Sequence, residues 1–325
     1  MKDLLLVIAF FTSLLTYSQV EFTRADTLRG SITPERAWWN VTYYDLDVKV
    51  NPSEKSISGS NVITYEVLES FQVMQIDLQS PMKIDNIIQD GENISFTSDG
   101  NAHFLELEKP QIRNEKNKIE IHFSGKPRIA KRPPWDGGFT WTKDNRGKDW
   151  VANANQGIGS SVWWPLKDHP SEEPDDGMTI AVTAPNHLMD VSNGQLKEVT
   201  ENNDNTKTWV WEVVNPINAY GVNVSIGDYV HFGETYQGEA GPLKMDYYVL
   251  PDYEKAARKQ FKQAPMMIEA FEYWYGPYPF YEDGYKLIHV PYLGMEHQSS
   301  VTYGNGFVNG YLGNDLSESG WGLKF

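Results

Sequence analysis

Cysteine is absent from the 325-residue sequence, and basic residues are scarce. Without thiols the chain can form no disulfide bond, no thiolate metal site and no cysteine nucleophile. Its 28 lysines and arginines stand against 44 aspartates and glutamates, which gives a formal net charge of −16 at pH 7. Because this excess of negative charge repels phosphate groups, we exclude nucleic acids and anionic membranes as binding partners.

Long apolar runs are also missing, except at the N-terminus. Residues 4–11 are uninterruptedly apolar, with Lys2 before them and Thr16-Tyr17-Ser18 after them as a cleavage site. The run is too short to cross a membrane and is typical of a secretory signal peptide. We therefore predict a signal peptide at residues 1–18, no transmembrane segment after its removal, and a secreted or periplasmic protein. Free and surface-attached forms remain open alternatives.

The sequence is rich in short stretches in which apolar and polar residues alternate, from about residue 41 to residue 232. A period of two predicts strands with one buried face, and the aromatic content of 13% favours extended structure. Turn residues such as Asn51-Pro52 and Asn193-Gly194 separate the stretches. The pattern predicts a mainly β fold with a large antiparallel sandwich or saddle-shaped sheet. The clearest apolar faces are Tyr44/Leu46/Val48/Val50, Ile63/Tyr65/Val67, Ile119/Ile121/Phe123, Met178/Ile180/Val182 and Trp209/Trp211/Val213.

The interval of residues 131–185 breaks this rhythm, because it is rich in tryptophan, proline, glycine and aspartate. Long irregular segments inside compact proteins are often functional. We predict ordered, packed loops here, in which most of the rings fill the core. The six rings that support this prediction are Trp135, Phe139, Trp141, Trp150, Trp163 and Trp164.

Near residue 245 the apolar period changes from that of a strand to that of a helix. Residues 245–250 and 285–290 read as strands, and the segment between them has helical spacing. We expect Asp252 to cap this helix, Pro265 to kink or split it, and Gly276-Pro277 to end it. A strand-helix-strand unit after a β region predicts a domain boundary, so we divide the mature chain into residues 19–238 and 239–325.

The segment Leu293-Gly-Met-Glu-His297 follows the second of these strands. A glycine at a strand end lets an extended peptide approach the backbone closely. A neighbouring carboxylate such as Glu296 can pair with the α-ammonium group of that peptide. On these five residues alone, a strand end beside a solvated carboxylate is the simpler interpretation.

A longer match changes that balance. Gly294-Met295-Glu296, followed by His297-Gln298-Ser299, resembles the Gly-x-Met-Glu-[Asn/His]-Gln-Ser motif of zinc aminopeptidases of the M1 (gluzincin) family. The motif's first glycine is Leu293 here, a departure that concerns one backbone contact. The resemblance implies that Glu296 binds the free N-terminus of a peptide substrate, and that Gly294 and Met295 offer it backbone hydrogen bonds.

A second segment, residues 156–170, is similar to the family segment that ends in Phe-Pro-Cys-x-Asp-x-Pro. Its cysteine is Leu166 here, and Gln156 stands nine residues before Pro165, where the family has a Gln or Glu that holds the substrate amine. On its own Gln156 reads as a loop amide bonded to backbone. The resemblance implies an aminopeptidase N-like β domain followed by the beginning of a thermolysin-like peptidase domain, with peptides as partners.

Family catalysis requires His-Glu-x-x-His on a helix, where two histidines bind zinc and the glutamate acts as base. None of the seven histidines precedes a glutamate in this pattern. We expect the motif about thirty residues after Glu296, and Phe325 lies 29 residues after it. We therefore expect zinc in the complete enzyme, but no bound metal, no catalytic residue and no hydrolytic activity in this chain.

Two alternatives remain. A non-enzymatic β-sandwich module would bind carbohydrate or protein through the tryptophan-rich loops. A zinc-free relative of the peptidases would keep their fold as a scaffold. Motifs of other chemistries are missing: the sequence has no Gly-x-Ser-x-Gly elbow and no phosphate-binding P-loop.

Overall fold

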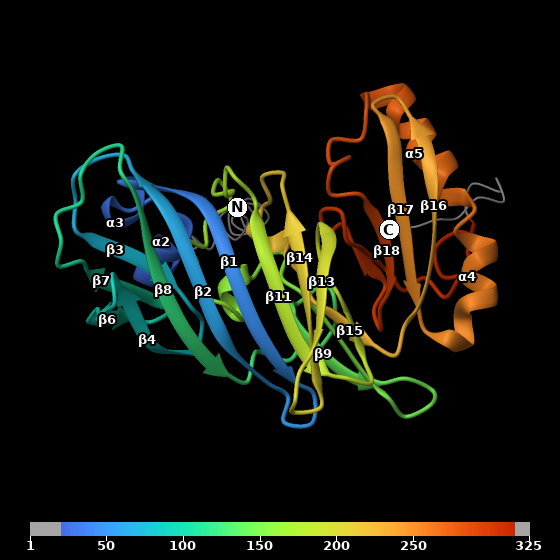
Figure 1. Cartoon of the computed structure of the whole chain (residues 1–325), viewed down its shortest axis with the longest axis horizontal. Helices are drawn as coiled ribbons and strands as arrows, with labels where there is room; N and C mark the ends of the chain where they lie inside the picture. Colours follow the sequence, from blue (N-terminus) through green and yellow to red (C-terminus); the bar gives the residue numbers. More distant parts are fainter. Residues whose placement is uncertain (1–20, 316–325) are drawn as a thin grey trace, which may run out of the picture.

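The computed structural model describes residues 21–315, and a large curved sheet dominates it (Figure 1). The signal peptide predicted at residues 1–18 lies outside the described residues. The eight strands of this sheet follow the order β13-β14-β11-β1-β2-β8-β4-β5. In chain order they are β1 (Trp39–Asn51), β2 (Ser56–Val67), β4 (Lys83–Gln89), β5 (Glu92–Asn93), β8 (Lys116–Gly125), β11 (Met178–Pro185), β13 (Gln195–Glu201) and β14 (Thr206–Val213).

Neighbouring strands of the large sheet are antiparallel, with one exception. β1 and β11 pair in parallel, with Tyr44 opposite Met178 and Val48 opposite Val182. A parallel pair needs a long crossover, and the whole of residues 52–177 connects these two strands. The apolar faces predicted from the alternation are all buried, so the prediction of a mainly β fold is confirmed.

Two smaller sheets share one hydrophobic core with the large sheet. One has the order β12-β15-β10-β9 and the other β3-β7-β6. Their strands are β3 (Val73–Asp77), β6 (Phe96–Asp99), β7 (Ala102–Glu106), β9 (Gly138–Lys143), β10 (Asp149–Ala154), β12 (Met189–Val191) and β15 (Ser225–Gly227). Short helices accompany them: α2 (Arg24–Gly30), α3 (Pro34–Ala37), η1 (Ser160–Val162) and η2 (Ala219–Gly221).

The tryptophan-rich interval is more regular than its composition suggests. It contains the hairpin β9–β10, whose strands pair from Gly138 opposite Ala154 to Lys143 opposite Asp149. The prediction of irregular loops was wrong here, because strands of six residues are too short to show a period among so many turn residues. The packing of the rings was predicted correctly for Phe139, Trp163 and Trp164, which are fully buried, whereas Trp135 is 71% exposed.

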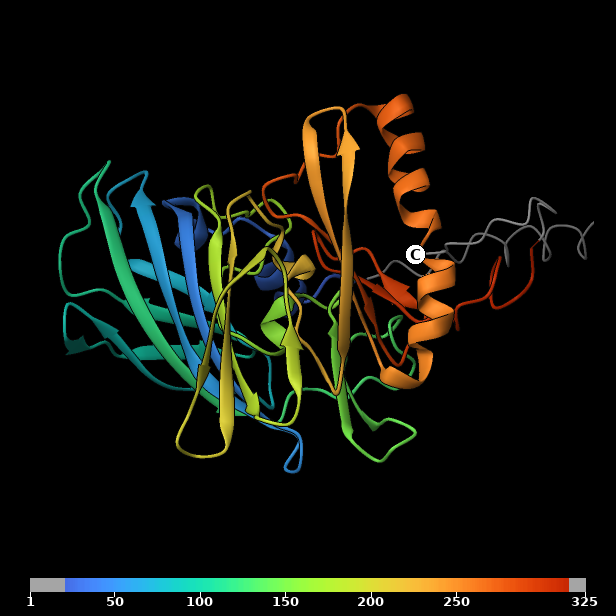
Figure 2. The ribbon, with the colours of Figure 1, turned by 45° about the vertical axis from the view of Figure 1, so that its right-hand side comes forward.

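The C-terminal part contains a further, mixed sheet with helices on one face (Figure 2). We call it the second sheet, and we call the three sheets described above, with their short helices, the β region. Its strand order is β16-β17-β18-β20-β19. The elements are β16 (Val230–Gly238), β17 (Gly241–Val249), η3 (Pro251–Tyr253), α4 (Glu254–Gln260), α5 (Gln263–Tyr275), β18 (Tyr285–His289), β19 (Gly294–Met295) and β20 (Val301–Tyr303). β17 and β18 are parallel, and α4 and α5 form the crossover between them.

Strands β17 and β18 are buried on both faces. Tyr247 and Leu287 belong to the core beneath α4 and α5, whereas Tyr248 and Ile288 belong to the core of the β region. Alternate side chains of a strand point to opposite faces. The second sheet therefore separates two cores and is packed directly onto the first part of the molecule.

Two details of the helical segment differ from the sequence-based expectations. Asp252 does not cap the helix, because it lies inside η3 and the helix that follows begins at Glu254. The helix does split near Pro265, but between Gln260 and Gln263: proline has no N–H to donate to the carbonyl four residues earlier. The aromatic residues at the end of α5 are exposed, and Trp274 is 74% accessible among the described residues.

The hairpin β16–β17 bears on the predicted domain boundary. Its strands pair from Val230 opposite Val249 to Gly238 opposite Gly241. A division between residues 238 and 239 falls in the turn of this hairpin, so it would assign the paired strands β16 and β17 to different domains. The pairing favours a division before Val230.

No helix of residues 21–315 is long and apolar enough to span a membrane.

A steric test of the large sheet is available at Gly59 in β2, which pairs with Val48. An added Cβ there would lie 1.9 Å from the backbone carbonyl oxygen of Asp47. We expect Gly59→Ala to lower the free energy of unfolding by about 2 kcal/mol, the usual cost of overpacking. Denaturant titration measures this change. Gly30→Ala is the matched control, since nothing lies within 4 Å of its Cβ position; equal stability of both variants would contradict the expectation.

Candidate substrate-anchor site

The fold brings together the two residues that the sequence motifs single out. The Gln156 side-chain nitrogen donates a hydrogen bond of 3.0 Å to Oε1 of Glu296, across 140 residues of sequence. Both side chains are exposed to solvent. The first follows strand β10 and the second follows strand β19, so the pair lies where the β region meets the second sheet.

Glu296 is positioned by a short edge strand. β19 pairs antiparallel with β20, with Gly294 opposite Tyr303 and Met295 opposite Thr302. Gly294 has a φ of 143°, and a Cβ there would lie 2.6 Å from the carbonyl oxygen of Thr302. Only glycine accepts this conformation and this approach without strain. Met295 is buried and belongs to the core of the β region, which fixes the carboxylate that follows it.

β19 is also the last strand of its sheet among the described residues. An edge strand has backbone N–H and C=O groups that are available to a further extended segment. The predicted role of Gly294 and Met295 as a backbone platform for a peptide is therefore compatible with their place in the fold.

The loop that carries Gln156 is held by the N-terminal helix. The Arg29 guanidinium of α2 donates a hydrogen bond of 2.5 Å to the carbonyl oxygen of Gly157. On the other side of the loop, the Ser160 hydroxyl donates to the carbonyl oxygen of Ala219 at 2.6 Å. A pocket of about 330 Å³ opens beside Gln156, between α2 and the η2 segment.

The turn Asn193-Gly194 links the β region to the Glu296 segment. The Asn193 side chain donates to the carbonyl oxygens of Gly221 at 2.8 Å and Gln298 at 2.6 Å. The Gly194 N–H donates to the Ser299 hydroxyl at 2.9 Å. All of these partners except Gln298 are buried. Because buried polar groups are costly to leave unpaired, these bonds hold the two segments in one arrangement.

Lys286 completes this linkage from strand β18. Its ammonium group donates to the carbonyl oxygen of Gly194 and lies 5.3 Å from the centre of the Trp211 ring. Only 3% of the residue is accessible. Burial lowers the pKa of Lys286 to about 7, an effect that Asp246 and Asp283 partly offset.

Two neighbours of Glu296, Tyr220 and His297, were given no role from the sequence. The phenol of Tyr220 in η2 interacts with the Glu296 carboxylate, and burial first and this carboxylate second raise the pKa of the phenol. His297 is fully buried, and burial lowers its pKa to about 3, so the ring is neutral at pH 7. The sequence offers no signal for Tyr220, because its contact with Glu296 arises only from tertiary structure.

The described residues do not fit a zinc ion. Across residues 21–315 no group of three or more His, Asp or Glu side chains is arranged to hold a metal. A zinc site needs at least three such ligands. We therefore derive no catalytic step through zinc from this part of the chain.

Comparisons with known proteins identify the fold first and then the family. An M1 zinc metallopeptidase from Deinococcus radiodurans matches with a TM-score of 0.68 at 19% identity, over 83% of this chain and 61% of that one. A mutant of that enzyme bound to a Tyr-Ser-Ala substrate matches with a TM-score of 0.69 at 20% identity, over 89% of this chain and 65% of that one. The chain thus spans less than two thirds of the length of these structures.

A comparison with protein families matches residues 40–220 to the peptidase M1 N-terminal domain. Since this match covers more than half of the sequence, the chain belongs to the M1 peptidase family. A search among curated proteins finds no match.

The buried ammonium of Lys286 predicts a pH-dependent stability. The folded state loses this proton near pH 7, whereas the unfolded state keeps it up to the ordinary lysine value of 10.5. The unfolded state therefore binds more protons between these values, and the contribution of Lys286 to stability rises with pH, by at most about 1.4 kcal/mol per unit.

We expect the free energy of unfolding of Lys286→Met, relative to wild type, to fall by at least about 1 kcal/mol between pH 7 and pH 9. Denaturant titrations at both pH values measure this difference. Lys83→Met, at a side chain that is 70% exposed, is the control and should show no such trend. A pH-independent difference for Lys286→Met would show that this ammonium does not titrate in the window.

Proposed function

We propose that this chain is the N-terminal part of a secreted or periplasmic M1 zinc aminopeptidase, and that Gln156 and Glu296 hold the free N-terminus of its peptide substrates. The observation that carries the proposal is the hydrogen bond between these two side chains, which come from motifs 140 residues apart. A relative of similar fold was solved with a Tyr-Ser-Ala substrate, which supports peptides as the substrate class.

The pair has the hydrogen-bonding capacity that an ammonium group requires. A carboxylate accepts about four hydrogen bonds, so the bond from Gln156 leaves capacity on Glu296. Because the amide nitrogen of Gln156 points to Glu296, its amide oxygen remains an acceptor for a second N–H of the ammonium. The charge of Glu296 makes the first of these bonds the stronger one.

The edge of β19 would bind the next part of the substrate. An extended peptide can add to this edge through backbone hydrogen bonds at Gly294 and Met295. An ammonium held at one end and a backbone held along a strand together fix the first peptide bond in space. Such positioning lowers the entropic part of a reaction barrier, and it would restrict cleavage to the N-terminal residue.

Zinc in this family activates a water molecule for attack on the peptide carbonyl. We propose that this chemistry resides outside residues 21–315, which supply substrate binding. The carbohydrate- or protein-binding alternative gains little support, since Trp163 and Trp164 are fully buried and Trp135 stands alone as a largely exposed ring of the six.

Binding of a free amine tests the anchor directly. We expect the chain to bind Tyr-Ser-Ala more tightly than its N-acetylated form, as measured by NMR titration. Glu296→Gln should reduce the affinity for the free peptide about tenfold, because one charge-assisted hydrogen bond is lost. Glu173→Gln is the control, since it removes a carboxylate near Tyr220 but outside the Gln156–Glu296 pair. Equal binding of both peptides by wild type would contradict the proposed anchor.

The assignment of zinc to another part of the protein is tested by metal analysis and activity. We expect the purified 325-residue chain to contain less than stoichiometric zinc by mass spectrometry and to release no N-terminal residues from peptides. Robust release that a chelator abolishes would refute this assignment. Reading the gene beyond Phe325 for His-Glu-x-x-His distinguishes an active enzyme from a zinc-free relative.

A further inference from the structure

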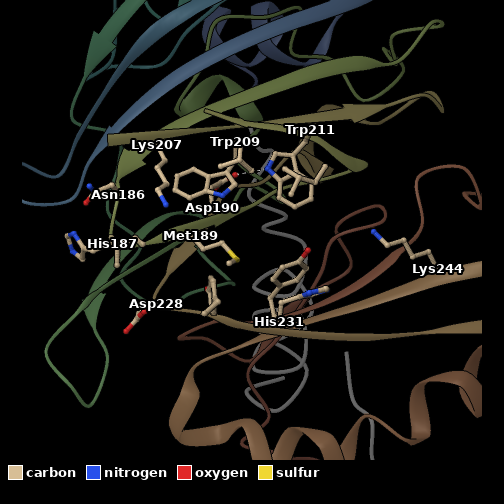
Figure 3. A pocket seen from close by; sticks show the side chains of 15 residues that line it. Asn186, His187, Met189, Asp190, Lys207, Trp209, Trp211, Asp228, His231 and Lys244 are labelled. Carbon is tan, nitrogen blue, oxygen red and sulfur yellow. Dashed lines mark hydrogen bonds between the residues drawn. The ribbon is translucent and has the colours of Figure 1, made fainter. Parts of the chain in front are cut away.

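A second pocket, of about 560 Å³, opens between the large sheet and the β16–β17 hairpin. Its volume is in the range of small-molecule sites, and junctions between structural units are a common place for them. Figure 3 shows Trp209, Trp211 and Met189 on one side and His231, from the hairpin, on the other. None of the proposed anchor residues lines it, so it is separate from the substrate site.

The apolar wall of this pocket is an extension of the core to an open sheet edge. Leu196 pairs with Trp211, and Val199 pairs with Trp209, across strands β13 and β14. A bulge between Leu196 and Glu198 shifts the register, so that two residues three positions apart face the same side. Leu196 and Val199 are 39% and 45% exposed. Apolar side chains on an exposed edge gain stability when an apolar group covers them.

The ionisable groups around the pocket are mainly basic, although the whole chain is strongly acidic. The basic groups in the lining are His187, Lys207, His231 and Lys244, and the acidic groups are Asp190 and Asp228. Lys207 extends from β14 toward the pocket in Figure 3. Lys207 pairs with Glu201, and Lys244 and His231 both pair with Asp246; neither carboxylate lines the pocket.

Both acidic groups in the lining are already engaged. Asp190 is fully buried and accepts hydrogen bonds from Trp211 at 3.0 Å and Ser192 at 3.1 Å, and burial raises its pKa well above the ordinary value. Asp228 forms an ion pair with Arg146. Lys207 is paired only loosely at the surface, with Glu201, whose side chain is 74% exposed, so its ammonium group is the charge in the lining that an anionic ligand can recruit.

We propose that this pocket binds an apolar group that carries a carboxylate, with the apolar part against Val199 and Trp209 and the carboxylate at Lys207. The C-terminal residue of a peptide and a small amphipathic acid share this chemistry. Inorganic anions do not fit the apolar wall.

N-acetyl-phenylalanine is the first probe, because its blocked amine cannot use the Gln156–Glu296 anchor. We expect N-acetyl-phenylalanine to show saturable binding in an NMR titration. The corresponding amide, which lacks the carboxylate, should bind about fivefold more weakly, because it loses one hydrogen bond to a charged group at a partly exposed site. Octanoate and N-acetyl-alanyl-phenylalanine distinguish the two sources: tighter binding of the dipeptide indicates a peptide C-terminus, and tighter binding of octanoate a free acid.

Two variants locate the binding. Val199→Trp places a larger side chain on an exposed edge position and should abolish binding, while circular dichroism confirms the fold. Lys207→Gln should weaken the binding of N-acetyl-phenylalanine by about fivefold and leave the binding of the amide unchanged. Lys197→Gln is the matched control, since Lys197 lies on the same hairpin, pairs with Glu212 and is outside the lining. Absence of saturable binding, or equal binding by Val199→Trp and wild type, would overturn the proposal, whatever the outcome at the amine anchor.

Discussion

Strands β17 and β18, at the centre of the sheet β16-β17-β18-β20-β19, are buried on both faces, and this burial is the constraint on which the rest of the structure depends. The two strands place Tyr247 and Leu287 under the helices, and Tyr248 and Ile288 against the core of the β region. If either the helices or the β region were removed from these strands, a large apolar surface would be exposed to water. The two parts of the chain therefore cannot turn freely about each other, and loops from both parts meet in a defined geometry at their junction.

The contact between Gln156 and Glu296 depends on that junction. Gln156 is carried by the β region and Glu296 by the second sheet, and their hydrogen bond of 3.0 Å requires that both be fixed. The buried Asn193-Gly194 turn supplies the local linkage through bonds to Gln298, Ser299 and Lys286. A site made from two structural units is sensitive to their packing, because small shifts at the junction change a geometry on which positioning depends.

The two pockets that we discuss differ in their chemistry. Beside Gln156 the polar loops and the exposed Glu296 carboxylate suit a cation. The pocket between the large sheet and the β16–β17 hairpin is lined by apolar side chains and by Lys207 and Lys244, which suit an apolar group with a negative charge.

The sequence by itself determined the mainly β class, the buried faces of the long strands and the two family motifs, because these depend on local period and on short patterns of residues. It did not reveal the hairpin β9–β10 or the turn η3, where short elements carry too few residues to show a period. Only the tertiary structure decided four features. They are the contact between Gln156 and Glu296, the contact of Tyr220 with Glu296, the buried charge of Lys286 and the pocket beside Val199. Each of them joins residues that are far apart in the chain, and such residues become neighbours only through the packing of the two cores.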